Sequence, residues 1–344
     1  MRTILTPISG LVVLTIACSA SPKSTSDAAP AAPAAPPATA PAPAPTNYHL
    51  LNRISLGKAD GWDYLTIDPA TRRLYISHEH DVLVVDADSG RIVGTIHKTA
   101  GVHGIALAPE LGRGFISDGD ANTVTIFEPA TLKVIGTTKV TGHDPDAIVY
   151  DSVTRRVFTM NGKGNNTTAI DATTGAVVGT IPLGGAPEFA VADGRGRIYV
   201  NIESTSELVA FDAHTLAPVG RWPLAPCATP SGLAIDRATR RLFVGCRSHV
   251  MAIVDADSGK VLTTFPIGDH VDADAFDPAT GLAFASTGEG TLAIVHEDDA
   301  NTFHAAQTVP TKPRAKTMAL DLSTHRVYTV TQDGADFVLL VYAP

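Results

Sequence analysis

Val82-Leu-Val-Val-Asp86 is an apolar run that ends in an acidic residue, and the pattern recurs at Val124-Thr-Ile-Phe-Glu128, Thr167-Thr-Ala-Ile-Asp171, Leu208-Val-Ala-Phe-Asp212 and Met251-Ala-Ile-Val-Asp255. Two later runs lack the final acid, Thr291-Leu-Ala-Ile-Val-His296 and Val338-Leu-Leu-Val-Tyr342. The end residues from 86 to 296 follow one another at intervals of 42, 43, 41, 43 and 41. A repeat of this length, built from short strands, is typical of one blade of a β-propeller.

Each repeat contains four short apolar runs, which predict four strands. In the first repeat these runs are residues 64–67, 73–77, 82–85 and 91–96. Turn-forming residues separate them, as in Asp68-Pro-Ala-Thr71 and Asp86-Ala-Asp-Ser-Gly90. No stretch shows helical periodicity, so the predicted fold class is all-β.

The two ends of the chain predict how the ring closes. The seventh repeat stops at Tyr342, after its third run, and therefore lacks an outer strand of its own. Near the other end, Asn52-Arg-Ile-Ser-Leu-Gly57 matches the outer-strand pattern of Gly179-Thr-Ile-Pro-Leu-Gly184. We predict that residues 47–344 form one seven-bladed β-propeller whose last blade takes its outer strand from residues 52–56, which removes the open edge.

The first 46 residues predict export and a tether rather than a fold. Residues 1–18 have a basic start, an apolar run over 4–17 and small residues around Cys18, as in a signal peptide. Leu14-Thr-Ile-Ala-Cys18 resembles a lipobox, which predicts lipidation of Cys18, and cleavage after Ala17 or Ala20 is the alternative. Residues 19–46 are rich in Ala, Pro and Ser and predict a disordered tether. We expect a periplasmic monomer held to the bacterial membrane by a lipid anchor.

Charge and cysteine content narrow the classes of partner and compartment. Lys and Arg total 26 against 35 for Asp and Glu, a net charge of -9 without a basic block, which argues against nucleic acid as a partner. Cys227 and Cys246 remain if Cys18 carries a lipid, and in an oxidising compartment they are expected to form a disulfide. Two buried free thiols are the alternative.

The turns between the first and second runs carry a further motif, which is found in Asp68-Pro-Ala-Thr-Arg-Arg-Leu-Tyr75, Asp151-Ser-Val-Thr-Arg-Arg-Val-Phe158, Asp236-Arg-Ala-Thr-Arg-Arg-Leu-Phe243 and Asp321-Leu-Ser-Thr-His-Arg-Val-Tyr328. With these motifs, residues 48–344 resemble the YVTN-repeat, YncE-like family of β-propellers. The resemblance implies an exported bacterial binding protein, and related propellers include lactonases and lyases. YncE-like proteins have been associated with DNA, and here the acidic balance argues against it.

Seven positions at the start of the inner strands predict a binding site. Aligning the repeats places one of them in each blade: Asp63, His103, Asp146, Glu188, Ser231, Asp272 and Lys316. The loops that carry them meet around the mouth of the central channel, so a mostly charged rim is predicted there. Such a rim can bind a cation or a cationic group, and we take Asp63, His103, Asp146, Glu188, Asp272 and Lys316 as candidate ligand-binding residues. Polar residues also occupy such loops in propellers without a binding role.

Two metal sites are possible beside this rim. His78 and His80 leave the second strand of blade 1, and His103 follows in blade 2, a set that with Glu79 and Asp118 suits Zn or Cu. An oxygen-rich set suits Ca instead: Glu188, Asn161, Asn201 and Glu203. The chain lacks Gly-x-Ser-x-Gly, phosphate-loop, Cys-x-x-Cys and His-Glu-x-x-His motifs. We therefore favour a binding or scaffold protein for a small ligand or an envelope protein, with a metal-dependent lactonase or lyase as the alternative.

Overall fold

The structure is a computed structural model that describes residues 47–344. The predicted signal peptide, the lipidation site at Cys18 and the tether over 19–46 lie outside the described residues. Within the described part, no helix is both long and apolar enough to cross a membrane.

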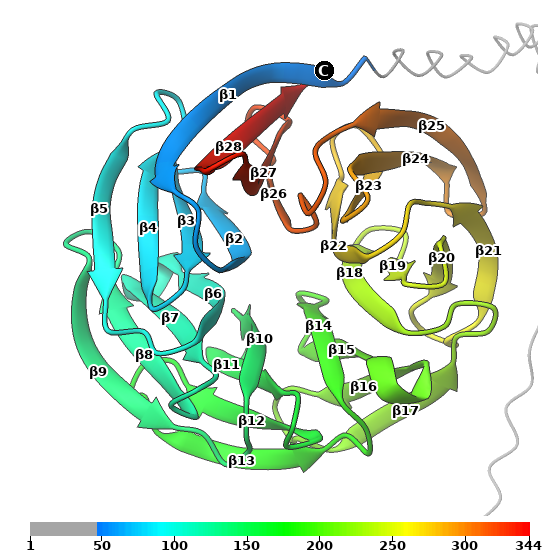
Figure 1. Ribbon diagram of the computed structural model, residues 1–344. Coiled ribbons are helices and arrows are strands. Elements are labelled where there is room, and N and C mark those ends of the chain that lie inside the picture. The colour runs from blue at the N-terminus through cyan, green and yellow to red at the C-terminus, as the bar shows by residue number, and fades with distance from the viewer. Residues whose placement is uncertain (1–46) are drawn as a thin grey trace, which may run out of the picture. The chain divides into compact units, whose positions relative to one another are not determined.

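The described residues form seven four-stranded antiparallel sheets arranged in a ring, which confirms the predicted seven-bladed β-propeller (Figure 1). Blades 1 to 3 consist of β2 (Trp62–Asp68), β3 (Arg73–His78), β4 (Asp81–Asp86) and β5 (Ile92–His97); β6 (Val102–Ala108), β7 (Arg113–Asp118), β8 (Thr123–Glu128) and β9 (Lys133–Lys139); and β10 (Pro145–Asp151), β11 (Arg156–Asn161), β12 (Asn166–Asp171) and β13 (Val177–Pro182).

The remaining blades continue in chain order. Blades 4 to 6 consist of β14 (Pro187–Ala192), β15 (Arg197–Ile202), β16 (Glu207–Asp212) and β17 (Pro218–Pro223); β18 (Pro230–Asp236), β19 (Arg241–Cys246), β20 (Val250–Asp255) and β21 (Val261–Pro266); and β22 (Val271–Asp277), β23 (Leu282–Thr287), β24 (Thr291–Asp299) and β25 (Thr302–Pro310). Two single turns of 3₁₀ helix, η1 (Pro109–Leu111) and η2 (Glu203–Thr205), lie in connections.

Blade 7 joins the two ends of the described chain. It consists of β26 (Met318–Asp321), β27 (Arg326–Asp333) and β28 (Asp336–Ala343), with β1 (His49–Lys58) as its outer strand. β1 runs antiparallel to β28 from the pair His49 and Ala343 to the pair Lys58 and Asp336, and Ile54 lies opposite Leu339. The predicted closing strand is confirmed, and it extends beyond residues 52–56 because β28 offers a partner along its whole length.

One aromatic side chain per blade packs in the core between neighbouring blades. It is the third residue of the second strand in each blade, and it is fully buried in all seven: Tyr75, Phe115, Phe158, Tyr199, Phe243, Phe284 and Tyr328. The recurrence explains why the repeat keeps Tyr or Phe at this point, since each ring fills the wedge between two twisted sheets. Burying an aromatic side chain of this size removes a large apolar area from water.

The second arginine of the turn motif binds the following blade. Arg156 donates hydrogen bonds to the carbonyls of Ala213 and His214 in blade 4, each at 2.7 Å. Arg241 donates in the same way to the carbonyl of Ala300 in blade 6 at 2.6 Å. Each of these carbonyls belongs to a turn between third and outer strands, so the arginine fixes the turn of its neighbour.

The first arginine of the motif binds the preceding blade. Arg240 pairs with Asp193 of blade 4 at 3.2 Å and with Asp257 of its own blade at 2.8 Å. Arg72 pairs in the same way with Asp321 of blade 7 and with Asp88 of its own blade. The Thr-Arg-Arg signature is therefore a connection between blades in both directions, which gives the sequence motif a physical role.

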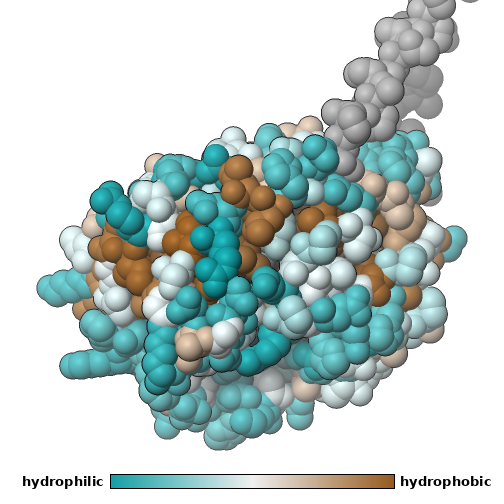
Figure 2. Space-filling model, turned by 45° about the horizontal axis from the view of Figure 1, so that its top comes forward, coloured by the Kyte–Doolittle hydropathy of each residue, from teal (hydrophilic) through white to brown (hydrophobic). Residues whose placement is uncertain are grey.

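The outer strands expose aliphatic pairs at their first residues. Bulges displace one residue of the pair from the ladder in blades 1 to 4, for example Val93 of β5 and Val178 of β13. Ile92, Val93, Val177 and Val178 are 39–49% exposed. Figure 2 shows hydrophobic residues of this kind among hydrophilic ones on the surface. A bulge at an outer strand hinders pairing with a strand of another molecule.

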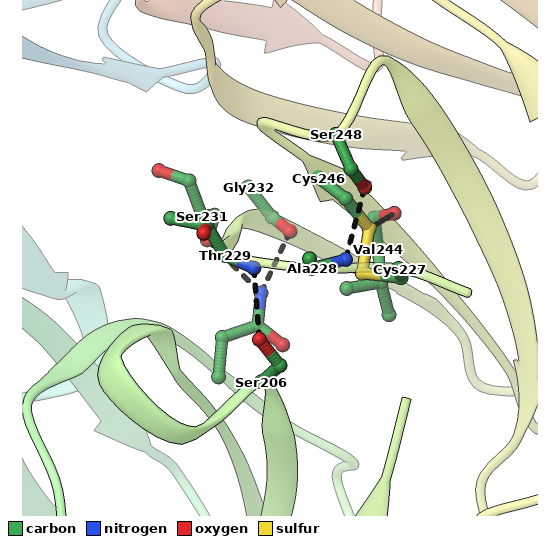
Figure 3. The surroundings of a disulfide bond; sticks show 10 residues. Ser206, Cys227, Ala228, Thr229, Ser231, Gly232, Val244, Cys246 and Ser248 are labelled. Atoms are coloured by element: carbon green, nitrogen blue, oxygen red, sulfur yellow. Dashed lines mark hydrogen bonds between the residues drawn. A yellow bond between two sulfur atoms is a disulfide. The ribbon is translucent and has the colours of Figure 1, made fainter. Parts of the chain in front are cut away.

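Cys227 and Cys246 form a disulfide with a Cα–Cα distance of 5.5 Å, as predicted (Figure 3). Cys227 lies in the loop before β18, and Cys246 is the last residue of β19. The same two loops also share hydrogen bonds from the Ala228 amide to Ser248 Oγ at 2.9 Å and from the Arg247 amide to the Thr229 carbonyl at 3.0 Å. The disulfide thus fixes the loop that carries Arg247.

Candidate functional site: the channel mouth

The seven predicted rim positions lie at the start of the inner strands, which line the centre of the ring (Figure 1). Six of them are the second residue of an inner strand, and Lys316 lies two residues before β26. We call the face where these strands begin the mouth face. The structure connects the rim residues in two separate networks of ion pairs.

The first network joins blades 1, 2 and 3. His103 Nδ1 lies 2.7 Å from Asp63 Oδ2 and 3.7 Å from Asp146 Oδ1. Burial lowers the pKa of His103, but the hydrogen bond to Asp63 and the charge of Asp146 outweigh it and raise that pKa to about 9. His103 is therefore a cation at neutral pH. The three side chains are close enough to share a metal ion.

The second network is centred on Arg247 and Asp272. Arg247 lies 2.5 Å from Glu203 and 3.6 Å from both Glu188 and Asp272. Asp272 also pairs with Lys316 at 2.5 Å and accepts a hydrogen bond from Ser231 at 3.1 Å. Sequence reasoning missed Arg247, although it follows the second strand of blade 5 as Glu79 and Glu203 follow theirs in blades 1 and 4. Its position next to Cys246 was the available signal.

Asp146 and Glu188, on neighbouring blades, are the rim carboxyls with the weakest cation partners. His103 is closer to Asp63 than to Asp146, and Arg247 is closer to Glu203 than to Glu188. Burial and the charges of Asp63 and Asp272 raise the pKa of Asp146 well above its usual range, although His103 opposes the shift. Burial, a hydrogen bond with Glu203 and the charge of Asp146 raise the pKa of Glu188. Both carboxyls thus hold protons where ordinary carboxyls have lost them.

An aromatic pair lies across the channel below the rim. Tyr64 follows Asp63 in β2, and Phe189 follows Glu188 in β14. Their ring centroids are 4.8 Å apart with an interplanar angle of 25°. Because blades 1 and 4 are not neighbours in the ring, this stack spans the channel. Burial and the charges of Asp146, Asp63, Glu188 and Asp272 raise the pKa of Tyr64, so its hydroxyl stays protonated close to the rim carboxyls.

The structure does not bring the proposed zinc or copper ligands to one point. The His78 ring packs 4.8 Å from Phe337, and His80 Nδ1 accepts a hydrogen bond from the Gly101 amide at 3.3 Å. Among residues 47–344, neither His78 nor His80 belongs to a group of side chains close enough to share an ion with His103. Metal binding by His78, His80 and His103 together stays a prediction, and it would require these side chains to move.

The oxygen-rich set for calcium is engaged elsewhere only in part. Asn161 accepts a hydrogen bond from Thr159 and donates to Asn166, both in its own blade. Asn201 donates through Nδ2 to the carbonyls of Ser231 and Gly232, while its Oδ1 is buried and has no hydrogen-bond partner among residues 47–344. Glu203 is paired with Arg247. Of this set, Glu188 alone lies at the rim without a close cation partner.

A cavity of about 270 Å³ opens beside Lys316 on the mouth face. Trp62, His270, Gly288, Arg314 and Lys316 line it. The Arg314 guanidinium carbon lies 4.5 Å from the centre of the Trp62 ring, a cation–π contact that holds the arginine over one wall. The cavity widens the mouth on the side of blades 6 and 7.

Comparison with known proteins supports the fold and leaves the family open. No family model matches the chain, and no curated protein matches it in sequence. Among solved structures, the chain is similar to Kuenenia stuttgartiensis hydrazine synthase, with a TM-score of 0.71, 14% identity and coverage of 83% of this chain and 97% of that one. It is also similar to a chain of the Mitotic Checkpoint Complex, with a TM-score of 0.74, 15% identity and coverage of 90% and 96%. A third match is U3-55K, with a TM-score of 0.72, 9% identity and coverage of 87% and 99%. These likenesses show a β-propeller fold.

Proposed function

We propose that the protein is an exported binding module that takes a small cation at the channel mouth, between Asp146 and Glu188. The observation that carries the proposal is the surplus of carboxyls at the rim. Among residues 47–344, five carboxyls at the rim pair with only three cationic side chains, His103, Arg247 and Lys316; the carboxyls are those of Asp63, Asp146, Glu188, Glu203 and Asp272. A ligand cation would supply the charge that Asp146 and Glu188 lack and would displace their protons.

The surroundings of the two carboxyls favour an organic ammonium group over a hard metal ion. Calcium requires six to eight oxygen ligands. Of the neighbouring oxygens, Asn161 Oδ1 already accepts a hydrogen bond from Thr159 and Glu203 is paired with Arg247, so Asn201 Oδ1 adds one unpartnered oxygen to the two carboxyls. The stacked rings of Tyr64 and Phe189 lie beside the carboxyls and can contact an aliphatic or ammonium group. A small protonated amine therefore matches both the charge and the apolar floor of the site.

Titration calorimetry with 1,4-diaminobutane and, separately, with CaCl₂ tests this proposal. Binding of the diamine should strengthen as the pH rises, because Asp146 and Glu188 must release protons to bind it. Asp146→Ala combined with Glu188→Ala should lower the affinity by about 30-fold or more, as expected when partners of a charge are removed. The matched control is Glu110→Ala with Glu128→Ala, which removes two carboxyls outside the rim and should leave the affinity unchanged. The proposal is refuted if the diamine does not bind, or if both double variants bind it with equal affinity; binding of calcium in its place would contradict the choice of an organic ammonium group.

We also propose that the module is lipid-anchored through Cys18 and lies in the periplasm. The apolar run before Cys18 and the Ala/Pro-rich stretch after it support this placement, and a disulfide between Cys227 and Cys246 fits an oxidising compartment. Cells grown with a labelled fatty acid should incorporate the label into the protein, and Cys18→Ser should abolish that incorporation. Equal labelling of the variant would show that Cys18 is not the attachment point.

A further inference from the structure

The hairpin of β24 and β25 in blade 6 differs from the corresponding hairpins of blades 1 to 5. Its strands are nine residues long, whereas the third strands of those blades have six. In those blades an acid ends the third run and caps the turn, as Asp86 does by accepting hydrogen bonds from the Ser89 amide and hydroxyl. In blade 6 the equivalent residue is His296, and the turn is capped further along by Asp299, which accepts from the Asn301 amide. His296 is thus released from the turn.

The pairing of the two strands brings three potential metal ligands to one face. His296 of β24 lies directly opposite His304 of β25. Asp298 is the extra residue of a bulge between Glu297 and Asp299, and its carboxylate contacts both imidazoles. Glu297, between them, points to the other side and is buried. The sequence therefore places two imidazoles and one carboxylate together.

The distances among these side chains suit a shared ion. His296 Nδ1 lies 3.0 Å from one Asp298 carboxylate oxygen, and His304 Nδ1 lies 2.8 Å from the other. The imidazole centroids are 5.0 Å apart, and the ligand atoms all lie within 4.8 Å of one another. Ligands bound to zinc at about 2.0–2.2 Å in a tetrahedral shell are roughly 3.3 Å apart. Small side-chain rotations would reach this arrangement.

The turn of the hairpin is held by blade 5, and the side chains of Asp298 and His304 are accessible to solvent. Arg241 of blade 5 holds the turn through the Ala300 carbonyl at 2.6 Å. The His296 side chain is only 15% exposed, and a Cβ at Gly281 would come within 3.3 Å of its Nε2, so its other nitrogen, Nδ1, is the atom available to a ligand. Asp298 and His304 are 32% and 46% exposed, which leaves room for water or another ligand to complete the shell.

We propose that His296, Asp298 and His304 bind one divalent transition-metal ion of the zinc type, through both Nδ1 atoms and a carboxylate oxygen. Imidazole and carboxylate are ligands that zinc accepts in open sites with a fourth position for water. Inner strands begin at the mouth face and neighbouring strands are antiparallel, so the end of β24, which carries the site, lies on the opposite face of the ring and is separate from the channel mouth. It is independent of the function proposed for the mouth.

Zinc titration by calorimetry tests the site, in a chain that carries Asp146→Ala and Glu188→Ala so that the mouth does not contribute. One zinc ion should bind per chain and raise the melting temperature. His304→Ala and Asp298→Asn should each weaken zinc binding by about 10-fold or more, because loss even of a group that only orients a ligand costs 10–100-fold. Cobalt(II) should give visible ligand-field absorption in the parent and lose it in His304→Ala.

His97→Ala is the matched control, because His97 is an exposed histidine whose Nδ1 lies 3.1 Å from Asp81. This variant should bind zinc as the parent does. Melting curves without zinc establish that each variant is folded, and the exposed His304 should tolerate replacement by Ala or Asn. The proposal is overturned if the parent binds no zinc, or if His304→Ala and His304→Asn, both folded, bind it as tightly as His97→Ala.

Discussion

A chain that begins at residue 59 should lose cooperative unfolding and aggregate, whereas a chain that begins at residue 47 should fold. The first lacks β1 and the second keeps it. Without β1, the edge of β28 from Asp336 to Ala343 has no partner, and Leu56 no longer covers the core beside Phe337 and Leu339. An exposed strand edge of this length favours association with other chains. Since a domain is stable by only about 5–15 kcal/mol, loss of the closing strand should consume most of that margin.

Thermal unfolding followed by circular dichroism, with light scattering for aggregation, measures this effect. Adding a synthetic peptide of residues 47–58 to the shorter chain should restore part of the transition. If the chain from residue 59 melts at the same temperature as the chain from residue 47, pairing of β1 with β28 does not contribute to the stability of the propeller.

Asp274→Asn should stabilise the protein at pH 8.5 by on the order of 1 kcal/mol or more, because at this pH the buried carboxyl must either carry an unpaired charge or hold a proton against the solution, whereas the amide stays neutral. Asp274 lies in β22 and is 9% exposed, and within the described chain neither carboxyl oxygen makes a hydrogen bond. Its carboxyl group fills space left by two glycines of blade 5, since a Cβ at Gly232 or Gly245 would come within 2.8 Å of it.

The stabilisation by Asp274→Asn should increase as the pH rises. Burial raises the pKa of Asp274 well above its usual value, and the nearby Gly245 amide only partly opposes this. A folded pKa above the unfolded one gives stability that is fully present below the unfolded pKa and is lost as the pH rises through the folded pKa. The variant and the parent should therefore be similar near pH 4 and diverge toward pH 8.5.

Urea unfolding at both pH values measures the difference, with the exposed Asp120→Asn as the control. Other buried carboxyls act in the same direction in the parent: burial raises the pKa of Asp118 to about 6 and that of Glu297 to about 7. The parent should consequently be most stable in weakly acidic solution. An Asp274→Asn variant that loses stability between pH 5 and 8.5 as steeply as the parent would contradict the assignment.

The features that could be predicted from the sequence are those set by local spacing. Blade number, closure by β1 and the pairing of Cys227 with Cys246 all follow from a repeat of constant length, because equal positions in a repeat occupy equal positions in the ring. The rim positions followed for the same reason. The repeat also shows that the third run of blade 6 ends in His296 instead of an acidic residue. That His296 lies opposite His304 follows only from the pairing of β24 with β25.

The contacts within the site could not be predicted, because they depend on how far side chains reach across the ring. The stack of Tyr64 on Phe189 joins two blades that are distant in sequence and not adjacent in space, and no local pattern reveals it. The direction in which His78 points is decided by Phe337, which arrives from the other end of the chain. Arg247 lies 2.5 Å from Glu203 but 3.6 Å from Glu188 and Asp272, and a sequence pattern does not resolve differences of this size.

Closure of the ring by its first strand affects how the protein is made. β1 leaves the ribosome before every other described strand, but its partner β28 is the last to be synthesised. At roughly 5–20 residues per second, β1 waits on the order of tens of seconds without its native neighbour, and Leu56, which is buried in the finished ring, stays accessible for that time. The ring therefore cannot close until β28 has been made, so a molecule truncated by premature termination keeps an open blade and an unpaired β1, and both favour proteolysis.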